Sequence, residues 1–273
     1  MKNGLINVDE ELQMYFQETG NGSVPILLLP GWTMSTDVFE KQFSFFEDSA
    51  DYRFVSLDPR AHGRSTKTHE GHYYEQHGRD LHACIEALAL ENFVLGGWSF
   101  GCLATLSYIH QFGFDRLARF IMLDGPPRAA GTDNENDWVT YTLDDADGQQ
   151  EFYSLGKLRD SRATNLEFAH WMLEERSQAT VDWLVSITEQ MPDSAACLLN
   201  ATSVFLDYRE TLIDVANNVP SLYYVRESQR AIVESWAQMN TPTARVHASG
   251  EHLMFWERAD EFNSTLVDFI QPR

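Results

Sequence analysis

The stretch VLGGWSFGC, residues 94–102, places one serine between two glycines directly after an apolar run. Its centre, residues 97–101, has the pattern Gly-x-Ser-x-Gly, in which a sharp turn from a strand into a helix lifts the serine hydroxyl above the end of a sheet. Glycines flank Ser99 because side chains would clash in so tight a turn. Since the pattern also arises by chance in glycine-rich loops, the surrounding segments have to decide whether Ser99 is a nucleophile.

Strands and helices alternate on both sides of this turn. An apolar strand precedes Ser99, and a helical pattern over residues 100–113 follows it and stops at a glycine. Elsewhere, continuous apolar runs indicate buried strands, and amphipathic runs indicate helices. Strands are expected within residues 24–32, 52–60, 117–125, 219–228 and 243–252, helices within 36–46, 78–88 and 258–270, and a hairpin within 5–20. This order predicts an α/β fold with a doubly wound, mainly parallel sheet.

The alternation is interrupted after Asp124. Residues 126–205 show amphipathic helical patterns, at 165–177, 180–191 and 193–206, and no convincing strand. We therefore divide the chain into a core, residues 1–125 and 206–273, and a helical cap, residues 126–205, over the carboxyl edge of the sheet. A separate helical domain is the alternative, but the segments on either side of the insertion each hold only an incomplete sheet.

The charge and composition restrict the partners. The 273 residues include 41 Asp and Glu against 20 Lys and Arg, and the net charge of −21 argues against binding to nucleic acid or to anionic membranes. No signal peptide or transmembrane run is apparent. Cys84, Cys102 and Cys197 lack the spacing of a metal site. We expect a cytoplasmic protein with reduced thiols, no metal and no cofactor, whose oligomeric state the sequence leaves open.

Four segments, in this order, resemble the alpha/beta-hydrolase superfamily over nearly the whole chain. They are LLLPGW (27–32), DPRAHGRS (58–65), GGWSFG (96–101) and SGEHLMFWERADEFN (249–263). The resemblance implies the alpha/beta-hydrolase fold, with the cap inserted after the sixth strand and Ser99 as the nucleophile. It also implies that the backbone N–H groups of Trp32 and Phe100 form an oxyanion hole, which stabilises the charge that develops on the carbonyl oxygen.

A serine nucleophile needs a neighbouring imidazole that takes its proton. The resemblance implies that His252, in the loop between the last expected strand and the last expected helix, is this base. His62 is a rival by residue type, but the resemblance gives it a structural role in a tight turn. His69, His72 and His77 do not have zinc-site spacing, and we interpret them as part of a solvated loop and helix start.

The carboxylate that completes a catalytic triad is less clear from the sequence. Most of the family place an aspartate after the seventh strand, where this chain has Gln229, and Arg226 replaces the usual glycine. Asp124, at the end of the sixth strand, and Glu227 are the two candidates. We expect Asp124, because its strand is the neighbour of the strand before Ser99, whereas Arg226 could pair with Glu227 instead.

These features predict a serine hydrolase that cleaves a small to medium apolar carboxylic ester, or a lactone, through an acyl-enzyme. The expected partner is an apolar small molecule, because several aromatic residues adjoin the motifs and the acidic surface repels anions. Among them Trp32, Trp98, Phe255 and Trp256 lie near the expected site, and Trp138, Trp171 and Trp183 lie in the cap.

The main alternative is a cofactor-free ring-cleaving dioxygenase of quinolone-like heteroaromatics. The chain resembles that branch in having Pro30 in the segment after an early strand and Asp124 after the sixth strand. In that branch two histidines hold the substrate, and this chain has Met34 and Trp98 at those positions. A dehalogenase would need an aspartate in place of Ser99. A non-enzymatic relative is disfavoured because Ser99 and His252 are both present.

Overall fold

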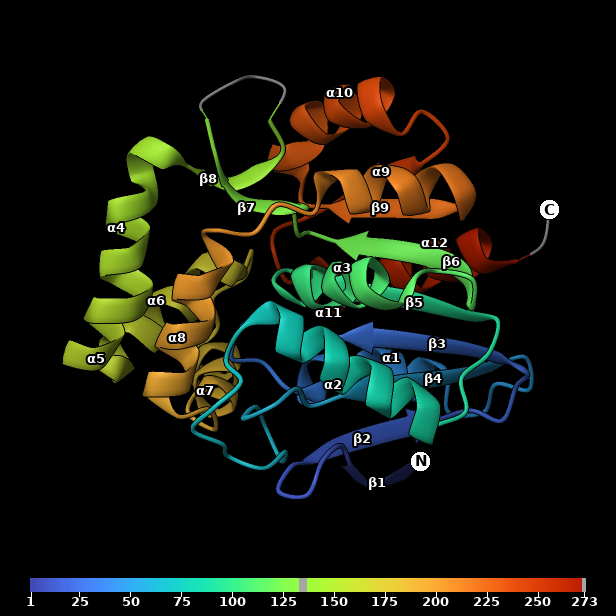
Figure 1. Ribbon diagram of the computed structural model, residues 1–273, viewed down its shortest axis with the longest axis horizontal. Coiled ribbons are helices and arrows are strands. Elements are labelled where there is room, and N and C mark those ends of the chain that lie inside the picture. The colour runs from blue at the N-terminus through green and yellow to red at the C-terminus, as the bar shows by residue number, and fades with distance from the viewer. Residues whose placement is uncertain (133–136, 272–273) are drawn as a thin grey trace.

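An eight-stranded sheet forms the centre of the protein (Figure 1). The computed structural model describes residues 1–132 and 137–271. The strands follow the order β1-β2-β4-β3-β5-β6-β9-β10; the pairs β1–β2 and β2–β4 are antiparallel and the others parallel. They are β1 (Lys2–Asn7), β2 (Gln13–Thr19), β3 (Val24–Leu29), β4 (Tyr52–Leu57), β5 (Phe93–Trp98), β6 (Leu117–Leu123), β9 (Ser221–Val225) and β10 (Arg245–Ala248). The predicted doubly wound sheet is confirmed.

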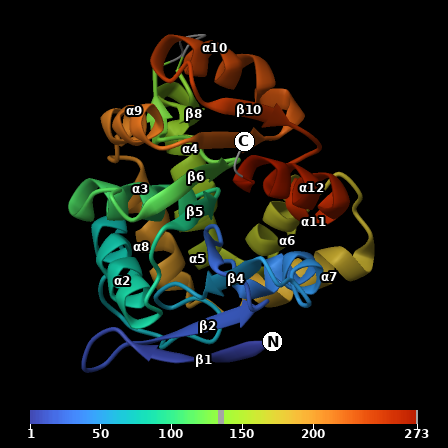
Figure 2. The same cartoon turned by 90° about the vertical axis from the view of Figure 1, so that its right-hand side faces the viewer.

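Helices cover both faces of this sheet, in keeping with the mainly apolar sequences of its central strands β3 and β5 (Figure 2). On one face α3 (Gly101–Phe112) packs between α2 (Tyr74–Ala87) and α9 (Arg209–Asn218). On the other lie α1 (Glu40–Phe45), preceded by the 3₁₀ turn η1 (Thr36–Phe39), and α12 (Ala259–Ile270), preceded by α11 (Met254–Glu257). Every residue of β5 and β9 is buried. The α10 helix (Arg230–Asn240), preceded by η4 (Glu227–Gln229), joins β9 to β10.

The insertion after β6 forms the cap, which lies beyond the carboxyl ends of the strands (Figure 1). Its helical segments are η2 (Leu143–Asp145), α4 (Ala146–Gln150), the π-helical segment η3 (Glu151–Gly156), α5 (Lys157–Arg159), α6 (Ser161–Met172), α7 (Gln178–Thr188) and α8 (Asp193–Ser203). None of the helices within the described residues is long and apolar enough to cross a lipid bilayer.

The expectation that the cap holds no strand is wrong. The short strands β7 (Arg128–Gly131) and β8 (Val139–Thr142) pair in a separate two-stranded parallel sheet. With four residues each, they lie at the lower limit of the length over which alternation indicates a strand, and the sequence of β7, RAAG, does not alternate. The predicted helices at 165–177, 180–191 and 193–206 correspond to α6, α7 and α8.

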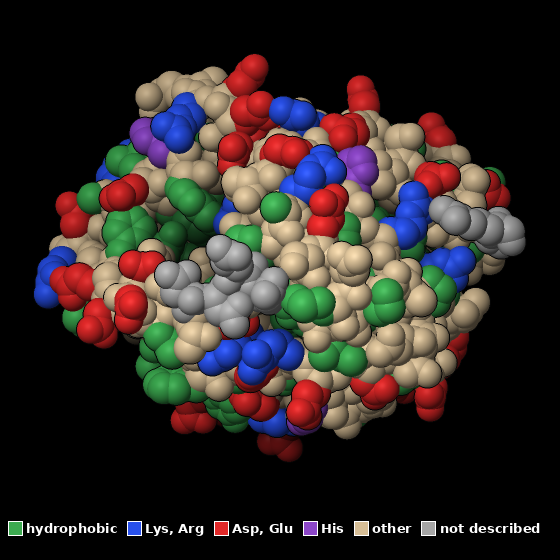
Figure 3. Space-filling view, turned by 90° about the horizontal axis from the view of Figure 1, so that it is seen from above, with side chains coloured by type: hydrophobic (Ala, Val, Ile, Leu, Met, Phe, Trp, Pro, Cys, Tyr) green, Lys and Arg blue, Asp and Glu red, His purple; other side chains and the backbone are tan. Residues whose placement is uncertain are grey.

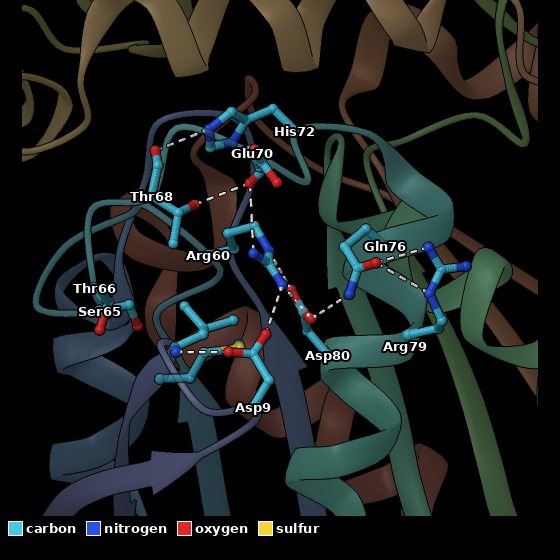
Figure 4. Close-up of polar contacts among 12 residues, drawn as sticks. Asp9, Arg60, Ser65, Thr66, Thr68, Glu70, His72, Gln76, Arg79 and Asp80 are labelled. Carbon is cyan, nitrogen blue, oxygen red and sulfur yellow. Dashed lines mark hydrogen bonds and ion pairs between the residues drawn. The ribbon is translucent and has the colours of Figure 1, made fainter.

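The turn after β4, residues 58–65, packs under α2 through buried charges. The Arg60 guanidinium donates two hydrogen bonds of 2.8 Å to the two carboxylate oxygens of Asp80, as Figure 4 shows. Asp58 accepts the backbone N–H groups of Thr36 and Arg64, each at 2.7 Å. These contacts tie the turn both to α2 and to the segment that follows β3.

Two histidines near this turn depart from expectation. His72 and His77 are buried, so their interpretation as part of a solvated loop and helix start is wrong, whereas His69 is exposed. His62 is buried in the turn, as expected of a structural residue, and its Nδ1 lies 2.8 Å from the carbonyl oxygen of Arg60. Burial lowers the pKa of His62 and of His77 to about 3, so both are neutral at pH 7.

Replacing Arg60 by leucine is expected to lower the free energy of unfolding by about 3–5 kcal/mol, because Asp80 would remain buried without its cation. Urea unfolding followed by circular dichroism measures this change. Arg79→Leu is the matched control, because Arg79 lies on the exposed face of α2, the helix that carries Asp80. It should change the free energy of unfolding by less than about 0.5 kcal/mol. Equal effects of the two substitutions would contradict the importance of the Arg60–Asp80 pair.

Candidate active site

Ser99 lies at the tip of a strained turn between β5 and α3. Its backbone has a φ of +54°, in the left-handed region, and its N–H donates to the carbonyl oxygen of Leu123 at 2.8 Å. A Cβ atom on Gly97 would lie 2.3 Å from the backbone of Gly101, and one on Gly101 would lie 2.6 Å from the carbonyl oxygen of Pro30. Both positions therefore require glycine, and the predicted strand–turn–helix context of Ser99 is confirmed.

The segment after β3 lies directly against this turn. Thr33 has a φ of +61°, and the Met34 N–H closes the turn onto the carbonyl oxygen of Gly31 at 3.1 Å. Among the described residues, the backbone N–H groups of Trp32 and Phe100 donate to no acceptor. Both residues line one cavity together with Ser99.

His252 meets Asp124 beside the elbow. The Nδ1 atom of His252 lies 2.5 Å from Oδ2 of Asp124, and the two side chains are only 3% and 2% exposed. Asp124 directly follows β6, which lies between β5 and β9 in the sheet. Its backbone has a φ of +45°, and its N–H donates to the carbonyl oxygen of Tyr224 at 2.8 Å. The expected neighbour relation between the strands therefore brings Asp124 to the histidine.

The alternative carboxylate, Glu227, lies away from His252. It is exposed and forms an ion pair of 2.7 Å with Arg230. The suggested pairing of Arg226 with Glu227 is wrong, because the Arg226 guanidinium donates to Oδ2 of Asp124 at 2.7 Å instead. Of the two candidates, the geometry favours Asp124 as the residue that orients the imidazole.

Charge and burial together set the protonation of this pair. Burial opposes ionisation of Asp124, but the cation of Arg226 and the hydrogen bond from His252 hold the pKa of this carboxyl below its ordinary value. For His252, burial lowers the pKa of the imidazole, although the Asp124 carboxylate acts in the opposite direction. At neutral pH the imidazole is therefore neutral and the carboxylate charged, which is the state required of a general base and its partner.

The second ring nitrogen of His252, Nε2, is buried and has no hydrogen-bond partner within the described part of the chain. His252 and Ser99 both line a small cavity at the base of the cap. The Trp98 indole holds the histidine loop in place by donating to the carbonyl oxygen of His252 at 3.0 Å, a role that its position before Ser99 does not reveal.

A cavity of about 350 Å³ lies between the elbow and the cap. Its walls are mainly aromatic, with polar groups supplied by Gln149, Glu167, Asn200 and Arg226. The π-helical segment η3 contributes two of the rings, in keeping with the frequent occurrence of such segments at functional sites. The aromatic residues are Trp32, Phe100, Tyr141, Phe152, Tyr153, Phe168 and Trp171. A larger, charged cavity of about 970 Å³ near α9 contacts neither Ser99 nor His252.

The cap tryptophans have different positions. The ring of Trp171 lies 4.6 Å from that of His252 between centroids and lines the cavity. Trp183 instead stacks on Trp256, at 5.1 Å, outside the cavity. Trp138 is buried against Tyr223 and lines only the smaller cavity at the base of the cap. From the sequence alone these residues could not be distinguished.

The family model for the alpha/beta hydrolase fold matches residues 24–266. The chain belongs to the alpha/beta-hydrolase family. It is 24% identical to a non-heme chloroperoxidase of Burkholderia pyrrocinia, over 97% of this chain and 99% of that protein. It is 26% identical to a bifunctional esterase/perhydrolase of Acinetobacter calcoaceticus, over 49% of each chain. Its fold is similar to that of an esterase from Exiguobacterium antarcticum, with a TM-score of 0.85 and 21% identity over 98% of this chain and 99% of that one.

The geometry predicts a large difference between two isosteric substitutions. Asp124→Asn should lower kcat for an ester by about 10⁴-fold, because an amide favours the wrong imidazole tautomer, and Glu227→Gln should leave kcat near the wild-type value. Steady-state kinetics measures both, with thermal melting as the check on folding. The opposite pattern would assign the role to Glu227.

Proposed function

We propose that the protein is a carboxylic-ester hydrolase that acts through an acyl-enzyme on Ser99, with His252 as the base and Asp124 as its partner. The observation that best supports this proposal is that a strained serine turn lines one small cavity together with a buried, neutral histidine whose Nδ1 is bound to a carboxylate. Without such a base a serine hydroxyl is a weak nucleophile at neutral pH.

The proposed reaction has two halves. Ser99 Oγ attacks the carbonyl carbon while His252 Nε2 takes its proton, and the N–H groups of Trp32 and Phe100 receive the oxyanion. His252 then gives the proton to the departing alcohol, which leaves the acyl group on Ser99. A water molecule, deprotonated by the same histidine, releases the carboxylic acid and restores Ser99.

The proposed substrate is a small to medium ester with an apolar acyl or aryl group, and a lactone has the same reacting bond. The aromatic walls and the 350 Å³ volume of the cavity support this choice. Acidic side chains are spread over the face that Figure 3 shows, in keeping with the net charge of −21. Such a surface disfavours the approach of polyanionic esters.

Ring cleavage by a cofactor-free dioxygenase is less well supported. Met34 and Trp98 occupy the positions at which that branch has its substrate-holding histidines, and both are buried outside the 350 Å³ cavity. Trp98 also uses its indole N–H to bond the histidine loop. Neither side chain is placed to bind a heteroaromatic substrate there.

Perhydrolysis is a second candidate, which the similarity to a bifunctional esterase/perhydrolase favours. Hydrogen peroxide would then replace water in the attack on the acyl-enzyme and release a percarboxylic acid. Formation of peracid from an ester and peroxide at a rate comparable with hydrolysis would support this activity. Its absence would restrict the proposal to ester hydrolysis.

The proposal predicts covalent chemistry at Ser99. A serine-directed phosphonate should add its mass to the tryptic peptide that contains Ser99, and Ser99→Ala should lower kcat by about 10⁴- to 10⁶-fold. Mass spectrometry and a panel of p-nitrophenyl esters of graded chain length provide the measurements. Persistence of ester hydrolysis in Ser99→Ala would contradict the acyl-enzyme.

The two cap tryptophans provide a matched test of the substrate pocket. Trp171→Ala should change the kcat/KM ratio between short and long acyl chains by about tenfold or more, because it enlarges the cavity beside His252. Trp183→Ala should leave this ratio unchanged and lower Tm instead, because its ring packs on Trp256. A shift in chain-length preference caused by Trp183→Ala alone would place the acyl site elsewhere.

A further inference from the structure

Arg226 follows β9 and extends into the active site beside Asp124. Its guanidinium Nη1 donates to Oδ2 of Asp124 at 2.7 Å, and its backbone N–H donates to Oδ1 at 3.0 Å. One residue therefore binds both oxygens of the carboxylate, from its side chain and from its main chain. The side chain is 17% exposed, against 2% for Asp124, so the pair lies mostly out of solvent.

The same oxygen of Asp124 accepts from the histidine. Oδ2 lies 2.5 Å from His252 Nδ1 and 2.7 Å from Arg226 Nη1, and these two nitrogens lie 3.4 Å apart. The imidazole and the guanidinium thus converge on one acceptor. Charge-assisted hydrogen bonds are shorter and stronger than neutral ones, so together with the backbone bond to Oδ1 they hold the carboxylate in the orientation that faces His252.

The cap closes over this arrangement from the other side. The Trp171 ring lies 5.3 Å from the guanidinium carbon of Arg226, within the range of a cation–π contact, and 4.6 Å from the His252 ring. Arg226 is therefore held by the carboxylate, by its own backbone and by the cap. It also lines the 350 Å³ cavity, and an arginine at that place could alternatively bind the substrate.

Within residues 1–132 and 137–271, few other charges act on His252. Glu251, in its own loop, favours the imidazolium, whereas Arg226 opposes it. From η3 and α6 of the cap, Tyr153 and Glu167 line the 350 Å³ cavity, and burial raises the pKa of Tyr153 to about 12, so its hydroxyl is neutral. Cys102, behind Asp124, is also neutral because burial raises the pKa of its thiol. Arg226 is thus the cation that acts on the histidine–aspartate pair.

We propose that Arg226 is a positioning residue, which orients the Asp124 carboxylate toward His252 Nδ1 and whose positive charge opposes a second positive charge on the imidazole. This inference rests on the proposed role of His252 as the base. The turn after β9 has no aspartate of its own. Instead, its Arg226 donates the hydrogen bonds that hold Asp124, which follows the neighbouring strand β6.

The sign of the expected pH effect follows from the charges. A cation beside the imidazole disfavours a second positive charge, so it lowers the pKa of His252, and burial acts in the same direction. Activity that needs the neutral imidazole is lost as the pH falls through this pKa. Removing the cation should therefore move the acid limb of the kcat/KM profile to higher pH.

The test compares Arg226→Met, Arg226→Lys and the control Arg230→Met with the wild type, using a p-nitrophenyl ester across the pH range. Arg226→Met should move the acid limb to higher pH and lower kcat by about 10- to 100-fold, with KM changed by less than about twofold. Arg226→Lys keeps the positive charge, so the acid limb of its kcat/KM profile should stay near that of the wild type while kcat falls. Arg230, which pairs with exposed Glu227, should have no effect on either quantity.

Three outcomes would overturn the inference. An unmoved acid limb in Arg226→Met would show that the charge does not act on His252. A rise in KM with kcat unchanged would make Arg226 a substrate anchor instead. An unchanged kcat in Arg226→Lys would overturn the positioning role. This variant alone provides the test if thermal melting shows that Arg226→Met is unfolded. Labelling of Ser99 by a phosphonate in the same samples tests the proposed function separately.

Discussion

The hydrogen bond between His252 and Asp124 joins residues that are 128 positions apart in the chain. It links the loop after β10 to the end of β6, and it depends on the sheet order, which brings the carboxyl ends of β6, β9 and β10 together. The cap begins two residues after Asp124, so the carboxylate proposed to orient His252 also lies at the start of the inserted segment. The strained backbones of Ser99 and Asp124 are held at this point by hydrogen bonds to neighbouring strands.

The cap and the core are coupled through Trp32 as well. Its indole N–H donates to the carbonyl oxygen of Ala196 in α8 at 2.8 Å, and its ring packs edge-on against Tyr153 and Phe168 of the cap. The backbone of the same residue offers an N–H group beside Ser99. A change in the position of the cap would therefore reach both the cavity wall and the donor proposed for the oxyanion, so acyl specificity and rate should respond together to cap substitutions.

Much of this arrangement could be predicted from the sequence, because its signals are local. The apolar runs identified every strand of the main sheet, and the two glycines around Ser99 identified the elbow. Adjacent strands in a parallel sheet also made Asp124 the better candidate over Glu227. What could not be predicted depends on side-chain direction and on long-range packing. Arg226 was recognised only as a departure from the usual turn, and nothing local shows that it points toward Asp124 rather than Glu227.

The burial of individual side chains could not be predicted from the sequence either. His72 and His77 are polar residues in a segment that looked solvated, and only the packing of the turn after β4 against α2 shows that they are enclosed. Likewise, Trp171 and Trp183 both occupy amphipathic cap helices, yet only Trp171 reaches His252. The four-residue strands β7 and β8 lie at the lower limit of the length at which alternation is informative.

The proton on His252 Nδ1 offers the most direct test of the account, because the proposed chemistry depends on its hydrogen bond to Asp124. In protein with ¹⁵N-labelled histidine, this proton should give a strongly downfield resonance in the proton NMR spectrum, coupled to Nδ1. The account predicts that the resonance persists in Glu227→Gln and is lost or moves upfield in Asp124→Asn. A resonance that Asp124→Asn leaves unchanged would contradict it.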